Sequence, residues 1–109
     1  MPTSYKVLGQ SNPAAITATT AYTVPSSTET VISTITVANL GAAPATYRIA
    51  VRPDGASLAN QHYIVYDSGL APQSTDTLTL GITLNASDIV TVYSSSATLA
   101  FNLFGSEIA

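Results

Sequence analysis

The chain has 109 residues, of which 46% are hydrophobic and only 8% are charged, and its formal net charge is −3. This length fits one domain, and the few basic residues argue against nucleic-acid binding, which needs a basic surface. The absence of Cys excludes disulfides and thiolate metal sites, and no apolar run approaches the ~20 residues of a membrane span. We therefore expect a single domain over residues 1–109 that binds neither nucleic acid nor membrane.

Turn residues divide the chain into short runs in which apolar and hydroxyl-bearing side chains alternate. This period of two is the pattern of β-strands. In chain order, the predicted strands are 5–10, 20–24, 29–39, 45–52, 61–66, 76–84, 89–94 and 97–104. They predict an all-β fold, an antiparallel sandwich of about eight strands that is jelly-roll-like or a Greek key. Residues 1–12 could serve as an N-terminal arm.

Alternation also assigns faces to these strands. It places Arg48 and Arg52 on one face of their strand and Tyr47 on the other, and it places Tyr63 opposite Tyr66. In the run 29–39 both faces are moderately apolar, which predicts a strand covered on both sides. The residues expected in the core are Tyr47, Tyr63, Leu78, Leu80, Leu99 and Phe101.

The chain offers little material for catalysis. His62 is its only histidine, and neither an HxH or HxxxH pair nor a GxSxG elbow is present. Most of the six acidic residues lie beside turns, where they bond nearby backbone N–H groups. We therefore expect no enzyme activity, no catalytic residue, no metal and no cofactor, and we assign His62 a structural or partner-contact role.

Arg48 and Arg52 are stronger candidates for partner contact. They are two of only three cations, and each guanidinium could hold a carboxylate or the backbone carbonyls of a partner. The alternative is a pair of exposed strand charges that protect solubility. Tyr5 and Lys6, in the N-terminal segment, complete the set of predicted contact residues.

Five segments of the chain carry a wider pattern: YKVLGQ, AYTVP, ATYRIAVRP, NQHYIVYD and FGSEI. Together they resemble small virion structural proteins of tailed bacteriophages, including phages that infect cyanobacteria. The resemblance covers nearly the whole chain, and RIAVRP and QHYIVYD are its most specific parts.

The resemblance implies a non-enzymatic virion structural protein. The favoured function is that of a capsid decoration, or cement, protein on the outer surface of the head. Its partners would be the major capsid protein and further copies of itself, with a trimer preferred. One alternative is a structural protein associated with the tail, baseplate or fibre. Another is a module that binds host glycans through Tyr63, Tyr66 and Asp67.

Overall fold

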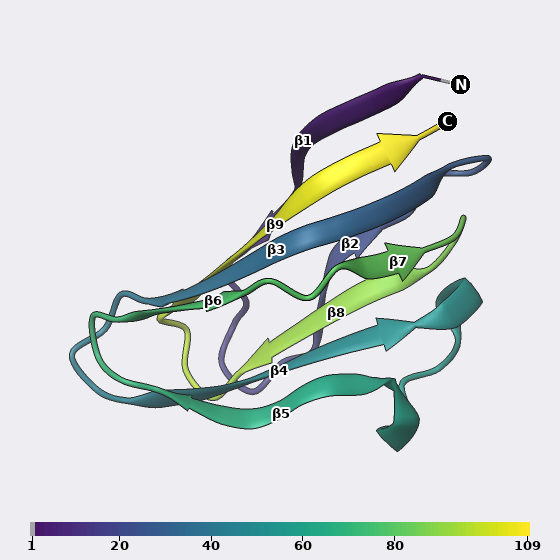
Figure 1. Cartoon of the computed structure of the whole chain (residues 1–109). Coiled ribbons are helices and arrows are strands. Elements are labelled where there is room, and N and C mark those ends of the chain that lie inside the picture. Colours follow the sequence, from purple (N-terminus) through teal and green to yellow (C-terminus); the bar gives the residue numbers. More distant parts are fainter. Residues whose placement is uncertain (1) are drawn as a thin grey trace.

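The structure, a computed structural model, describes residues 2–109 as two antiparallel sheets packed face to face (Figure 1). The predicted all-β sandwich is confirmed, with nine strands across these residues in place of about eight. The strands are β1 (Thr3–Ser11), β2 (Thr19–Thr23), β3 (Glu29–Asn39), β4 (Ala45–Arg52), β5 (Tyr63–Leu70), β6 (Thr75–Leu78), β7 (Ile82–Leu84), β8 (Ile89–Ser94) and β9 (Leu99–Ile108). Sheet A has the order β1–β9–β3–β6, with β7 also on β3, and sheet B has the order β2–β8–β4–β5.

The strand pairing is nested. Because β6 and β7 follow each other along β3, they count as one interrupted strand. The first strand then pairs with the last, the second with the seventh, the third with the sixth and the fourth with the fifth. This is the pairing of a jelly roll, one of the two sandwich topologies that the strand count predicted.

The interruption between β6 and β7 corrects one prediction. Residues 76–84 do not form a single strand, because Gly81 adopts a φ of +67°, which a regular strand cannot contain. Leu80 consequently points away from the core and is 52% exposed. Its assignment to the core was wrong.

The core lies between the inner faces of the two sheets. Tyr47 and Phe101 meet there edge to face, with ring centroids 6.0 Å apart, and Leu99 is also fully buried. Strict alternation fails in β3, where an irregularity between Ile32 and Thr34 adds a residue and shifts the buried positions. Tyr63, which was expected in the core, is only half-buried.

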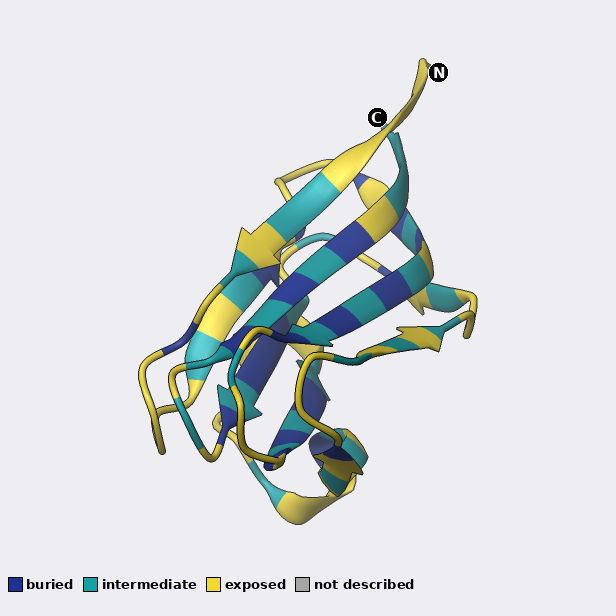
Figure 2. Cartoon of the chain, turned by 90° about the vertical axis from the view of Figure 1, so that its left-hand side faces the viewer, coloured by how far each residue is buried: buried dark blue, intermediate teal, exposed yellow. Residues whose placement is uncertain are grey.

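The two ends of the chain lie together at one end of the molecule (Figure 2). Residues 3–11, within the segment expected as an arm, form the edge strand β1 and pair along β9. The backbone N–H of Ala109 donates to the carbonyl of Pro2 at 3.1 Å. Met1 lies outside the described residues.

Helical structure within residues 2–109 is limited to single 3₁₀ turns at Pro53–Gly55 and Asn60–His62. No helix in this range is long and apolar enough to cross a membrane.

Candidate interaction surfaces

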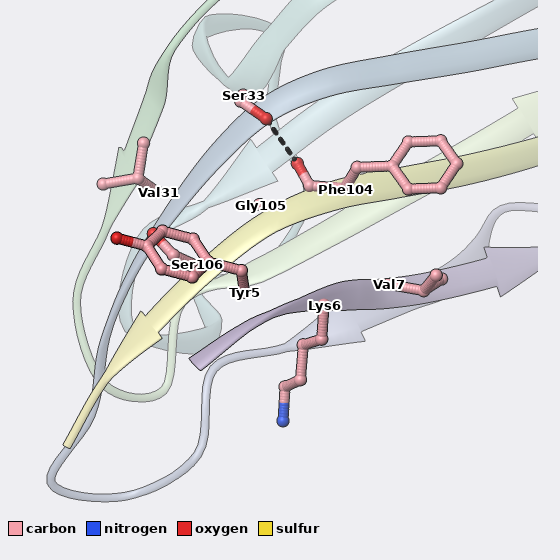
Figure 3. Close-up of a pocket in the computed structure, with 8 residues that line it drawn as sticks. All are labelled: Tyr5, Lys6, Val7, Val31, Ser33, Phe104, Gly105 and Ser106. Atoms are coloured by element: carbon pink, nitrogen blue, oxygen red, sulfur yellow. Dashed lines mark hydrogen bonds between the residues drawn. The ribbon is translucent and has the colours of Figure 1, made fainter. Parts of the chain in front are cut away.

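The first candidate surface is on the outer face of sheet A, where β1, β9 and β3 lie side by side. Register places Tyr5 beside Ser106 and Ser106 beside Val31, and it places Val7 beside Phe104 in the neighbouring row. Tyr5 is 85% exposed and Val7 49%. These side chains border an open hollow of about 560 Å³, which we call the outer groove (Figure 3).

Two small residues of β9, Gly105 and Ser106, are among the residues that line the hollow. A Cβ at position 105 would collide with the backbone oxygen of Val31, so Gly105 allows β9 to pair closely with β3. Beside it, the Ser33 hydroxyl donates to the carbonyl of Phe104 at 3.2 Å (Figure 3). The shape of the groove beside Gly105 therefore depends on the close pairing of β9 with β3.

Lys6 also lines the groove, but its side chain lies on the opposite face of β1 from Tyr5 (Figure 3). Its Nζ is 2.6 Å from Oε1 of Glu107. The hydroxyl of Tyr22, on sheet B, donates to Oε2 of the same carboxylate at 2.5 Å and lies 2.8 Å from the Thr30 hydroxyl. Lys6 thus belongs to a network that joins the two sheets.

These contacts shift two pKa values in opposite directions. The hydrogen bond from Lys6, followed by the one from Tyr22, lowers the pKa of Glu107. Burial, followed by the hydrogen bond to Glu107, raises the pKa of Tyr22 to about 12. The network is therefore stable with Glu107 ionised and Tyr22 protonated.

The second candidate surface is on the outer face of sheet B and centres on Arg48. Its register neighbour on β8 is Tyr93. On β5, Ser68 faces Tyr47 and Val65 faces Ile49, so two residues, Tyr66 and Asp67, stand opposite Arg48 alone. This is a β-bulge, and Asp67 has the positive φ of 52° that Asp tolerates better than most residues. We call Arg48, Tyr63, Tyr66, Asp67 and Tyr93 the arginine–tyrosine cluster.

The bulge directs both residues at the guanidinium. Asp67 accepts from Nε of Arg48 at 2.6 Å and from Nη2 at 3.2 Å, and this contact lowers the pKa of Asp67. The guanidinium carbon lies 4.2 Å from the ring centroids of both Tyr66 and Tyr93. Arg48 is therefore held by a bidentate ion pair and by cation–π contact with two rings.

A second irregularity in β5 brings Tyr63 beside Tyr66. Ile49 faces Val65 while the next residue, Ala50, faces Tyr63, so Ile64 is an extra residue. The two tyrosine rings meet at 85° with centroids 4.9 Å apart. The prediction that they lie on opposite faces was wrong, because a regular strand was assumed.

Arg52 lies on the same outer face as Arg48 and binds other groups. Its Nε donates to the Thr91 hydroxyl at 3.1 Å, and its Nη1 donates to the carbonyl of Ala56 at 3.0 Å. Arg52 therefore links two parts of the chain: strand β8 and the turn that comes after β4. Its partners are a hydroxyl and a carbonyl of its own chain.

His62 is buried, with 8% of its surface exposed. Its Nδ1 accepts a hydrogen bond from the backbone N–H of Ala59 at 3.0 Å, which closes the turn before β5. The small exposed fraction leaves little of the side chain for contact with a partner.

Of the predicted contact residues, the structure brings together only Arg48 and Arg52. Tyr5 lies on the outer face of sheet A, across the sandwich from them, and the half-exposed side chain of Lys6 lies on the other face of β1 beside Glu107. Sequence reasoning missed Phe104 as the neighbour of Val7 beside Tyr5, because only strand register shows that residues so far apart in sequence are adjacent.

Within residues 2–109, no three His, Asp or Glu side chains gather in a group that could hold a metal ion. Comparisons with protein-family models, with curated proteins and with solved structures found no match to this chain.

Proposed function

We propose that this chain is a non-enzymatic structural protein of a phage particle, a capsid decoration protein that binds the assembled major capsid lattice and stabilises the head. The observation that carries the proposal is the outer groove. Tyr5, Val7 and Phe104 leave apolar surface exposed on a sheet face that no other part of residues 2–109 covers. Contiguous exposed apolar surface is typical of sites that bind other proteins.

The charges of the chain support the same function. Lys6 and Arg48 are paired with carboxylates of their own chain, and Arg52 is bonded to internal acceptors. Binding through the groove therefore depends on apolar burial and hydrogen bonds, which salt screens little. The jelly-roll pairing adds an analogy of fold alone, since viral capsid domains are among the proteins that use it.

We further propose that copies of the protein associate on the lattice, with a trimer as the preferred state. The strand β1 is an open sheet edge, and its one charged residue is already paired with Glu107. Edges without free charge or Pro are poorly defended against pairing with another copy. Closed symmetric assemblies are the usual result. Two results together would contradict this: only monomer in sedimentation at high concentration, and no contact between copies on the particle.

Binding to the assembled state but not to free coat subunits shifts the equilibrium toward assembly. The test is to add back purified protein to particles that lack it and to measure their resistance to heat and to low salt. Wild-type protein should restore resistance, and this should persist when binding is carried out in high salt. A variant with Tyr5→Ser, Val7→Ser and Phe104→Ser should fold and fail to restore it.

Leu40→Ser is the matched control, because Leu40 is 69% exposed in a loop outside the groove. It should act as wild type. Particles that are equally robust without the protein, together with labelled protein found on the tail, would overturn the decoration function. A groove variant that binds heads normally would overturn the role of the groove.

A further inference from the structure

We propose that the arginine–tyrosine cluster borders a binding site for a neutral saccharide, a function separate from binding to the capsid lattice. The site is a hollow of about 390 Å³ lined by Asn60, Tyr63 and Tyr66. It lies on the outer face of sheet B, so a protein bound to a lattice through the outer groove of sheet A would leave it open to solvent.

The walls of the hollow fit the two kinds of surface that a sugar ring presents. The rings of Tyr63 and Tyr66 stand nearly at right angles, and Tyr66 is 59% exposed. The C–H groups of a sugar carry partial positive charge and stack on the electron-rich face of an aromatic ring. Asn60 is exposed beside them, and its amide can both donate to and accept from sugar hydroxyls.

The walls are held in place before any ligand arrives. Tyr66 rests on the guanidinium of Arg48, which Asp67 and Tyr93 fix in turn. Asn60 belongs to the turn that His62 closes through its bond to Ala59. A preformed site loses less conformational entropy on binding, which matters most for weakly binding ligands such as sugars.

Two features indicate that the ligand is small and uncharged. The volume is at the lower end of the range of about 300–1,000 Å³ for small-ligand sites. The charge of Arg48 is neutralised by the bidentate contact with Asp67, so the site offers no free cation to an anionic ligand. A neutral hexose or a short chain of hexoses satisfies both conditions.

The two irregularities of β5 also support a binding site at this position. A regular strand would place Tyr63 and Tyr66 on opposite faces, and the register shifts in β5 bring both onto the same outer face. Bulges that redirect side chains are common beside binding sites. The edge strand β5 therefore lacks regular pairing with β4, and in its place the rings of Tyr63 and Tyr66 form two walls of the hollow.

The test uses an array of neutral oligosaccharides made of glucose, galactose, mannose and N-acetylglucosamine units, with titration calorimetry of each sugar that binds. Wild-type protein should bind at least one of them. Tyr66→Ala and Asn60→Ala should each weaken binding by about tenfold or more, which corresponds to about 1.4 kcal/mol. Asn60→Ala alters an exposed turn residue, so its fold should survive even if Tyr66→Ala disturbs Arg48.

Tyr5→Ala is the control, since it removes an even more exposed tyrosine from the other face. It should bind the sugar as wild type does, and the Tyr66 and Asn60 variants should still protect heads. No binding across the array, or binding unchanged in both the Tyr66 and the Asn60 variants, would each overturn the saccharide site. None of these outcomes bears on the capsid function.

Discussion

Single residues at the edges of the core link the two sheets by polar contacts. Tyr22 and Tyr47 each have a buried ring, and each directs its hydroxyl to a carboxylate on sheet A, Glu107 and Asp76 respectively. Burial and these hydrogen bonds raise the pKa of both tyrosines to about 12. Each pair therefore fixes the distance between the sheets at one position.

Replacing Glu107 by Gln should make stability less sensitive to acid. Because Lys6 and Tyr22 lower the pKa of Glu107, its contribution is complete above the ordinary glutamate pKa and is lost as pH falls through that value and then through the folded value. At neutral pH the variant should lose about 1–2 kcal/mol of unfolding free energy. Urea melts across an acid pH series should show this difference from wild type shrinking as pH falls.

Glu29→Gln is the matched control for that series, because Glu29 is exposed at the start of β3. It should follow the wild-type pH dependence. Equal behaviour of the two variants would show that the network around Glu107 contributes nothing to acid sensitivity.

Removing the hydroxyl of Tyr47 should destabilise the fold at neutral pH. In Tyr47→Phe, Asp76 loses a donor at 2.9 Å while the ring still fills the core, which should cost about 1–3 kcal/mol. Thermal unfolding measures the loss. Tyr5→Phe, which removes an exposed hydroxyl, should change nothing, and an equal effect at both positions would contradict this account.

The same two tyrosines predict the response to base. Their raised pKa values mean that the stability from Tyr22 and Tyr47 is complete below the ordinary tyrosine pKa and is lost as pH rises toward about 12. An ultraviolet absorbance titration should show two tyrosines that ionise near pH 12, together with unfolding. In Tyr47→Phe only one late tyrosine should remain.

At the scale of strands, the alternating pattern predicted well where most strands lie in the sequence, and it predicted less well which face of the sheet each residue occupies. The bounds of β3, β4 and β8 match the expected runs because turn residues such as Gly, Pro, Asn and Ser flank each of these strands. The irregularities in β1, β3 and β5 were not predictable, since one extra residue in a strand leaves no mark on composition. For this reason the sequence identified Arg48 as a candidate and missed how Tyr66 and Asp67 converge on it.

A glycine in β9 should be essential for the pairing of that strand with β3. In Gly105→Ala the new Cβ meets the backbone oxygen of Val31, so the strands must separate. We expect a loss of at least about 1–3 kcal/mol, the usual cost of overpacking, and a changed outer groove. Gly69→Ala is the control, since nothing lies within 4 Å of the Cβ that it adds. Similar melting temperatures for both variants would contradict the predicted clash.

For the whole molecule, nested pairing makes the two terminal strands unequal. The last strand, β9, lies inside sheet A between β1 and β3, and its Leu99, Phe101 and Leu103 are fully buried. The first strand, β1, is an edge and mostly exposed. A chain that lacks residues 99–109 should not fold, whereas one that lacks residues 1–11 should keep a weakened sandwich. Amide NMR spectra distinguish the two, and equal loss of structure would contradict this difference.

The adjacency of Pro2 and Ala109 has a consequence for anything attached to the chain. Because Pro2 and Ala109 lie side by side at the same end of the molecule, the backbone nearly closes on itself. A short linker between the ends, with new ends opened at the break in pairing beside Gly81, would give a circularly permuted protein with the same contacts. Cargo fused to either end of these 109 residues would project from the same end of the molecule, and moving it from one end of the chain to the other would hardly change its position.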